Sequence, residues 1–290
     1  MARRRPRVAA LAVALASLLG AERASAEPSL ALPAPEPPPA PDHFIDPKMR
    51  RTWSEGEARP FLSTQIDAGF LYLRPRLSLG YGKPFNTWLG VDVNPVANAA
   101  SAGAYGGVRF ALPFVDVRVG ARPLFSYQRR FLTPQPSIDG YTLEATENPH
   151  AHSLAYEAEI DAAIPLGPGR VRALARASYV TAVRQGYWVY EEALRIVVAP
   201  PWVLRARIGY ALPVPGLPSF SLAPVFDLVD VPGRDRGLSA RAGVIARAVL
   251  SRHLEIRGVF VPTLRSPDTI GLAGGDFTEL GLRYRWATGE

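Results

Sequence analysis

The stretch from Val115 to Arg130 alternates between two kinds of side chain with a period of two. One face carries Val115, Val117, Val119, Ala121, Pro123, Phe125 and Tyr127, and the other carries Asp116, Arg118, Gly120, Arg122, Leu124, Ser126, Gln128 and Arg130. Such alternation predicts a β-strand. At a rise of ~3.3 Å per residue and a tilt of roughly 40°, the part that ends at Tyr127 climbs about 30 Å. That length suits the apolar band of a membrane barrel, about 25 Å, and is unusual in a soluble strand.

The first 26 residues have the organisation of a secretory signal peptide. A basic start precedes a short apolar run, Val8 to Gly20, and Ala24-Ser25-Ala26 supplies the small residues that signal peptidase requires. A membrane anchor is the alternative, but the run is short and is followed by Glu22 and Arg23. We therefore expect a signal peptide at residues 1–26 and export of the mature chain.

Residues 27–60 form a second segment without periodicity. Their first part, EPSLALPAPEPPPAPD, is rich in proline, and the remainder is charged and mixed. This composition predicts an extended, disordered periplasmic linker. Residues 61–290 are then left to form the folded domain.

Two features that the sequence lacks limit the possible folds of that domain. The chain has no cysteine, which excludes disulfides and thiolate metal sites. After residue 26 no run of 18 or more apolar residues remains, so membrane insertion has to use strands. The net charge of +7 does not indicate nucleic-acid binding, because the chain is exported and its basic residues come singly on strands.

A predicted hairpin places opposite charges beside each other. Residues 153–164 and 170–182 are strand-like, and Leu166-Gly167-Pro168-Gly169 forms the loop between them. A four-residue loop sets the register so that Glu159 lies opposite Arg176. We interpret the neighbouring acidic and basic faces as a ladder of charges.

The strand-like segments continue to the end of the chain. They include Tyr187 to Val198, although its two faces are less distinct. We expect an all-β fold, a closed antiparallel transmembrane β-barrel of about twelve strands, within a range of about ten to fourteen. Pro123, Pro224 and Pro262 fall within these segments and require bulges or strand ends, because a closed barrel pairs every backbone N–H.

The last predicted strand, Phe277 to Trp286, alternates Leu280, Leu282, Tyr284 and Trp286 with polar residues and glycine. It resembles the C-terminal recognition strand of bacterial outer-membrane β-barrel proteins, which typically ends on an aromatic residue with apolar residues at alternate positions before it. In this chain four further residues follow the aromatic. The resemblance implies location in the outer membrane, contact with its lipid, and insertion by the barrel-assembly machinery through Leu280–Trp286.

The cost of burying arginine in lipid decides which face points inward once a membrane is assumed. An arginine on the lipid face costs ~2–4 kcal/mol at the midplane, against a net stability of about 5–15 kcal/mol. The charged face is therefore expected to line the lumen. The predicted lumen-lining residues are Asp116, Arg118, Arg122, Glu157, Glu159, Asp161, Arg172, Arg176, Arg205, Arg207, Arg241, Glu255, Arg257, Arg283 and Arg285. The predicted lipid-facing and interfacial aromatic residues are Phe125, Tyr127, Tyr156, Trp202, Tyr210, Phe260, Tyr284 and Trp286.

A catalytic alternative rests on His152 and Ser153. Outer-membrane lipid hydrolases resemble one another in a His and a Ser placed close together on a strand at the membrane rim. The asparagine that usually follows the serine is Leu154 here, and a polar junction between loop and strand explains the two residues equally well. His150 and His152 have no evident third ligand, so no metal site is predicted, and no motif indicates a cofactor.

Two interpretations of the lumen remain open. The excess of arginine over acidic residues predicts a narrow, anion-preferring channel for small hydrophilic solutes. In a narrow barrel the same side chains can instead fill the lumen with salt bridges and leave a structural barrel. An outer-membrane lipid hydrolase and a soluble periplasmic β-protein are the alternatives. The expected partners are outer-membrane lipid and small anionic solutes.

Overall fold

The protein is described here by a computed structural model that covers residues 56–69, 72–98, 100–144, 147–270 and 279–289. The predicted signal peptide, residues 1–26, and most of the predicted linker, residues 27–60, lie outside the described residues. No helix in the described part of the chain is long and apolar enough to cross a membrane.

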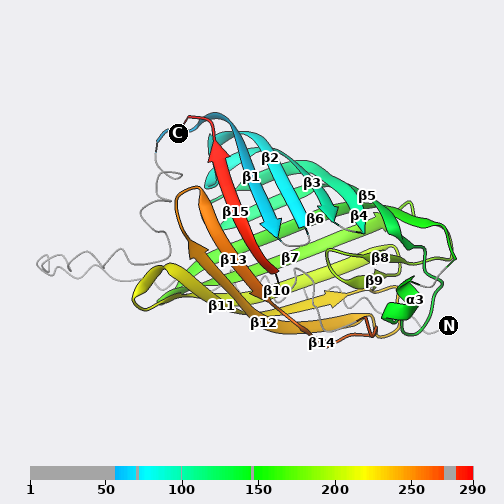
Figure 1. Cartoon of the computed structure of the whole chain (residues 1–290). Coiled ribbons are helices and arrows are strands. Elements are labelled where there is room, and N and C mark those ends of the chain that lie inside the picture. The colour runs from blue at the N-terminus through cyan, green and yellow to red at the C-terminus, as the bar shows by residue number, and fades with distance from the viewer. Residues whose placement is uncertain (1–55, 70–71, 99, 145–146, 271–278, 290) are drawn as a thin grey trace, which may run out of the picture. The chain divides into compact units, whose positions relative to one another are not determined.

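Twelve antiparallel strands form a closed barrel, as the sequence predicted (Figure 1). The strands are β1 (Arg59–Gly69), β2 (Tyr72–Lys83), β3 (Thr87–Asn98), β4 (Ser101–Ala111), β5 (Val115–Arg130), β6 (His150–Leu166), β7 (Gly169–Thr181), β10 (Trp202–Val214), β11 (Leu217–Asp230), β12 (Leu238–Val249), β13 (Leu254–Phe260) with β14 (Thr263–Arg265), and β15 (Glu279–Ala287). β13 and β14 both pair with β12 and together occupy one position in the wall. The ring closes where β15 pairs with β1, from Ser63 opposite Ala287 to Gly69 opposite Gly281.

The two ends of the barrel differ. The connections β5–β6, β7–β10, β11–β12 and β14–β15 leave from one end, which we call the loop end, and the first of them carries the short helix α3 (Gly140–Glu144). Short turns between β2 and β3, β4 and β5, β6 and β7, β10 and β11, and β12 and β13 form the opposite end, the turn end. In Figure 1 the loop end is on the right, beside α3. Long loops at one end and short turns at the other are typical of outer-membrane barrels.

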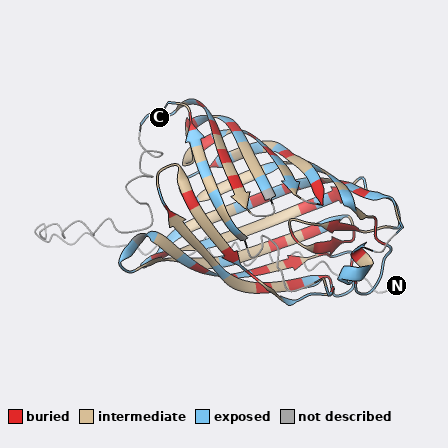
Figure 2. Ribbon diagram, in the orientation of Figure 1, coloured by how far each residue is buried: buried red, intermediate tan, exposed pale blue. Residues whose placement is uncertain are grey.

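Side chains alternate between the two faces of the wall (Figure 2). On β2, for example, Leu73, Leu77, Leu79 and Tyr81 are each at least 50 % exposed, whereas Ser78 is buried. The wall strands follow this two-residue period over much of their length, because successive side chains of a strand point to opposite faces. The outer face is therefore apolar and the inner face carries most of the charge.

The prolines that interrupt the predicted strands coincide with local gaps in the pairing. Pro262 lies in the break between β13 and β14. The β4–β5 pairing omits Arg122 and Pro123, and the β10–β11 pairing omits Pro224, although both strands continue through these positions. Proline has no N–H to donate to the ladder, which accounts for its part in each gap.

The register of the predicted hairpin is confirmed. In the β6–β7 pair, Glu159 lies opposite Arg176 and Pro165 opposite Arg170. The sequence left the segment Phe70 to Tyr81 open as one strand or two. Its residues 72–81 belong to the single strand β2, which continues to Lys83, and residues 70–71 lie outside the described residues.

The prediction of a wall strand at Tyr187 to Val198 is wrong. This segment instead forms a small separate hairpin, β8 (Val189–Glu191) and β9 (Ile196–Val198), within the connection between β7 and β10. Its faces lacked clear alternation because β8 and β9 are covered on both sides: Val189, Tyr190, Ile196, Val197 and Val198 are all buried. Figure 2 shows this hairpin as a patch of buried residues at the loop end.

Candidate functional site

One aspartate on β11 is shared by three arginines. Asp227 is fully buried and accepts hydrogen bonds from Arg205 Nε at 2.9 Å and from Arg207 Nη2 at 3.2 Å. Arg241 Nη1 on β12 lies 3.7 Å from the same carboxylate. The buried carboxylate of Asp227 therefore holds the three guanidinium groups close together.

A second network joins β5, β6 and β7. Glu157 accepts a hydrogen bond from Arg122 Nε at 2.8 Å and is also bonded to Arg176, whose strand partner across the hairpin is Glu159. Arg118 Nη2 lies 2.6 Å from Glu159. This network is the charge ladder that the hairpin register predicted, extended to a third strand.

Further ion pairs lie between neighbouring strands in the rest of the wall. Arg283 binds Asp67 across the β15–β1 closure, with Nη2 2.9 Å from Oδ2, and Arg109 on β4 reaches Asp92 on β3 at 3.2 Å. In each of these networks the partners lie on neighbouring strands. These ion pairs therefore connect adjacent strands of the wall and do not cross the lumen.

The β8–β9 hairpin is held from two sides of the barrel. Arg122 on β5 donates to both carboxylate oxygens of Glu191, at 3.1 and 2.9 Å. Arg241 on β12 donates to the carbonyl oxygen of Leu194 at 2.5 Å. Since β5 and β12 are separated by four strands around the ring (β6, β7, β10 and β11), residues 191–195 bridge the lumen near the loop end.

Apolar packing fixes the same hairpin to the inner wall. The first cluster joins hairpin residues to lumen-facing residues of β6, β7, β10 and β11, and its members include Val189, Leu194, Ile196 and Val198 with Ala151, Ala155, Val180, Val203 and Val229. The second cluster joins the hairpin to the β5–β6 connection: Leu132, Ile138, Leu143, Tyr190 and Val197. The loop end of the lumen is thus filled by a water-excluding core.

Polar contacts complete this closure. Arg129 Nε donates to Glu192 at 2.7 Å, and its guanidinium lies 5.5 Å from the ring centre of Tyr190. Burial, reinforced by the Glu192 carboxylate, raises the pKa of Tyr190 above its ordinary value. Arg234 and Asp268, both buried, join the β11–β12 and β14–β15 connections, with Nη2 2.7 Å from Oδ1.

Asp139 precedes α3 in the β5–β6 connection. Its carboxylate accepts a hydrogen bond from the backbone N–H of Thr142 at 2.7 Å. Hydrogen bonds from the Thr142 side chain and backbone lower the pKa of Asp139. This contact satisfies a backbone donor at the start of the helix.

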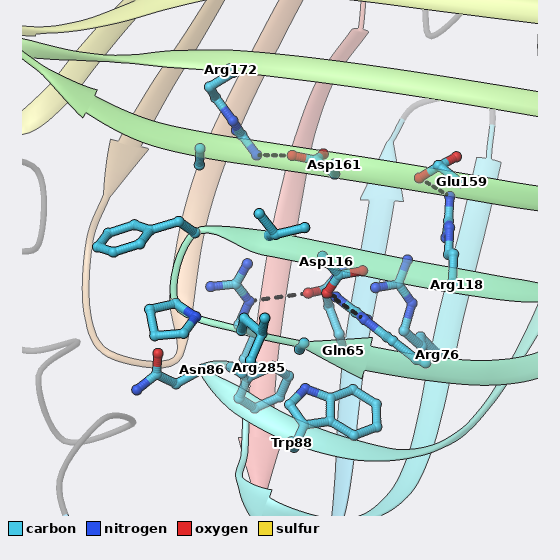
Figure 3. Close-up of a pocket in the computed structure, with 18 of the residues that line it drawn as sticks. Gln65, Arg76, Asn86, Trp88, Asp116, Arg118, Glu159, Asp161, Arg172 and Arg285 are labelled. Carbon is cyan, nitrogen blue, oxygen red and sulfur yellow. Dashed lines mark hydrogen bonds and ion pairs between the residues drawn. The ribbon is translucent and has the colours of Figure 1, made fainter. Parts of the chain in front are cut away.

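A basic cavity of about 380 Å³ occupies the lumen at the turn end (Figure 3). The β2–β3 and β4–β5 turns contribute to its lining, together with side chains from β1 to β7, β13 and β15. Its lining includes seven arginines, Arg76, Arg109, Arg118, Arg172, Arg257, Arg283 and Arg285, and three carboxylates, Asp116, Glu159 and Asp161. Trp88 and Phe85 also line it, and each stacks against an arginine, Arg109 at 5.2 Å and Arg285 at 5.5 Å.

The residues predicted to line the lumen fall into these two regions. The cavity contains Asp116, Arg118, Glu159, Asp161, Arg172, Arg257, Arg283 and Arg285, and the ion-pair networks contain Arg122, Glu157, Arg176, Arg205, Arg207, Arg241 and Glu255. Sequence reasoning missed Asp67, Arg76, Asp92, Arg109 and Asp227 as members of these sites. Asp92 and Asp227 were detectable, because each interrupts a run of apolar residues at a lumen-facing position.

Most of the aromatic residues predicted to face lipid are exposed. Those with large exposed areas are Phe125, Tyr127, Tyr156, Trp202, Phe260, Tyr284 and Trp286. Tyr210 is only partly exposed, and its hydroxyl donates to the carbonyl oxygen of Leu166 at 2.6 Å.

The geometry does not support the catalytic alternative. His152 is exposed, whereas Ser153 is buried, because adjacent residues of β6 point to opposite faces of the wall. The histidine therefore has no access to the serine hydroxyl as a general base. Among the described residues no group of three or more His, Cys, Asp or Glu side chains is placed to hold a metal ion.

Comparison with known proteins gives matches in structure alone. No protein-family model matches the sequence, and neither does any curated protein. Among solved structures, the chain is similar to the NanC porin, with 12 % identity, 79 % of this chain and 97 % of that chain covered, and a TM-score of 0.36. It is also similar to the KdgM porin, with 7 % identity over 78 % and 97 % of the two chains and a TM-score of 0.35. For the COG4313 outer membrane channel from Pseudomonas putida F1 the identity is 11 %, the coverage 86 % and 98 %, and the TM-score 0.40. These proteins belong to the general class of outer-membrane β-barrels that the last strand resembles, and the likeness extends to barrel architecture only.

Proposed function

We propose that this protein is a narrow, anion-preferring channel of a bacterial outer membrane, closed at its loop end by the β8–β9 hairpin. The observation that carries the proposal is the charge of the cavity lining, which among the described residues has seven arginines and three carboxylates, inside a barrel whose outer face is apolar. A ring of arginine side chains at a constriction favours anions over cations.

Location in the outer membrane is supported by the outer surface. Large apolar side chains are exposed on successive strands around the ring, and soluble monomers rarely expose a continuous apolar surface of this extent. The predicted signal peptide and the C-terminal strand Leu280–Trp286 support the same location and the proposed use of the barrel-assembly machinery. The soluble periplasmic alternative is not favoured, because that surface would be left in water.

Selectivity in planar bilayers tests the proposal. With a gradient of potassium chloride across the bilayer, we expect the reversal potential of the purified protein to show that chloride permeates better than potassium. Replacement of Arg172 by glutamate should shift the reversal potential toward cation permeability. Arg172 is suited to this change because it is 48 % exposed and its pair with Asp161 is long, 3.7 Å.

The matched control is Arg236→Glu, in the exposed β11–β12 connection at the loop end. It alters net charge equally but lies outside the cavity, so we expect little change in selectivity. Preference of the wild-type protein for potassium would contradict the proposal.

A plugged structural barrel is the second candidate function. It is favoured by the apolar packing of the β8–β9 hairpin against the inner wall. This candidate predicts no conductance from the wild-type protein, because the hairpin stays packed in the lumen. The two candidates are therefore separated by one measurement.

A further inference from the structure

The basic cavity at the turn end has more arginines than carboxylates among the described residues of its lining. Among the described residues, seven arginines and three carboxylates line it, and the wall carboxylates Asp67, Asp92 and Glu255 pair with Arg283, Arg109 and Arg257. Glu255 is in addition shared with Arg247, at 3.0 Å, outside the lining. Within the described part of the chain, the lining itself therefore has an excess of guanidinium groups over carboxylates.

Arg76 on β2 is the clearest member of that excess. Within the described part of the chain its guanidinium group forms no ion pair with a carboxylate. The charged groups that act on it most strongly are Arg109 and Arg118, while Asp92, already paired with Arg109, provides a smaller attraction. Figure 3 shows the side chains of Arg76 and Arg118 at the cavity. A partly buried cation among other cations is stabilised by an anion that binds beside it.

The neighbouring arginines are already held in place. Arg118 is fixed by Glu159 and lies 5.7 Å from the ring centre of Tyr105, and Arg109 is fixed by Asp116 and Trp88. Their side-chain entropy has been lost before any ligand arrives, so less is lost on binding. Guanidinium groups fixed in this way match the paired oxygens of phosphate and carboxylate groups.

The size and distribution of charge in the cavity indicate the class of ligand. Its volume of about 380 Å³ lies within the range of small-molecule sites. Arg76 on β2, Arg172 on β7 and Arg257 on β13 approach from different parts of the ring, so one small monovalent ion does not contact all of them. We propose that this cavity is a binding site for a small polyanion, a solute with two or more phosphate or carboxylate groups.

This inference deepens the proposed function, since the site would lie on the anion path, but binding is measured without conduction. The purified full chain in detergent micelles is titrated calorimetrically at low ionic strength with pyrophosphate, with citrate and with acetate. We expect pyrophosphate or citrate to bind at one site per barrel, and acetate to bind at least about tenfold more weakly, because it offers one charged group to the arginines. The affinities for pyrophosphate and for citrate show whether the site prefers phosphate or carboxylate groups.

Two variants test the location of the site. Arg76→Gln and, separately, Arg172→Gln should each weaken binding by about tenfold or more, because each removes a charged hydrogen-bond donor. Arg236→Gln, the control at the loop end, should bind as the wild-type protein does. The shift in gel mobility on heating confirms that each variant is folded, and Arg172→Gln remains informative if Arg76→Gln does not fold.

Absence of polyanion binding to the wild-type protein would overturn the inference, and so would equal losses in the cavity variants and the control. Anion-selective conductance without such binding would reject this site and leave the proposed channel intact. Binding without conductance would reject the channel and leave the site intact.

Discussion

Replacement of Asp227 by alanine is expected to lower the free energy of unfolding by about 3–5 kcal/mol, the usual effect of removing one partner from a buried ion pair. The reason is specific to this site. Asp227 is fully buried, and its loss leaves Arg205, Arg207 and Arg241 together inside the wall without their shared carboxylate. Since a folded domain is typically stable by only about 5–15 kcal/mol, a large share of the variant should be unfolded under mild denaturation.

The measurement is a urea titration of the purified barrel in detergent. At each urea concentration, the folded fraction is read as the share of protein that keeps the mobility of the folded barrel on a gel run without heating. Asp230→Ala is the matched control, because it removes the same side chain from the same strand at a position that alternation places on the other face. We expect the control to change stability by less than about 0.5 kcal/mol. If both variants unfold at the wild-type urea concentration, the cluster around Asp227 does not stabilise the barrel.

The double variant Glu191→Gln and Glu192→Gln is expected to increase the time that the channel spends open by about tenfold or more. Glu191 and Glu192 tie the β8–β9 hairpin to Arg122 and Arg129 through charge-assisted hydrogen bonds. The glutamines keep the size of the side chains but remove the charge, so the hairpin leaves the lumen more readily. Arg122 retains Glu157 as a partner, so the barrel wall stays intact.

Single-channel recording in planar bilayers measures this change. The control is Glu144→Gln, since Glu144 also lies near Arg129, at 3.8 Å, but is 77 % exposed. An exposed ion pair of this kind contributes little, and we expect no change in opening. Equal opening of the double variant and the wild-type protein would show that these ion pairs do not control the lumen.

The wall of the barrel was predictable because it follows from local patterns. The strand Val115–Arg130 has the same bounds in the structure as in the sequence, and the β6–β7 register follows from the length of one loop. A hydrophobic period of two and a short loop allow few strand registers once the charged face has to avoid lipid.

The occupied lumen was not predictable by the same reasoning. Residues 187–198 have strand-forming side chains. Their sequence alone does not distinguish a strand of the wall from a hairpin that pairs with itself inside the barrel. Their partners, such as Arg122 and Arg241, are distant in sequence and were identified only as lumen-facing. The small apolar residues Ala151 and Ala155 on β6 were equally uninformative, because their role depends on a hairpin that packs against them.

The apolar core at the loop end should make that part of the barrel less sensitive to the choice of detergent. A barrel filled with water is held together mainly by strand pairing and by the lipid around it. Here Val229 and Val203 contact chain atoms on their inner side as well, so part of the hydrophobic burial persists whichever amphiphile surrounds the exterior. Exchange of one detergent for another should therefore disturb the half of the molecule around β8 and β9 less than the half that surrounds the arginines.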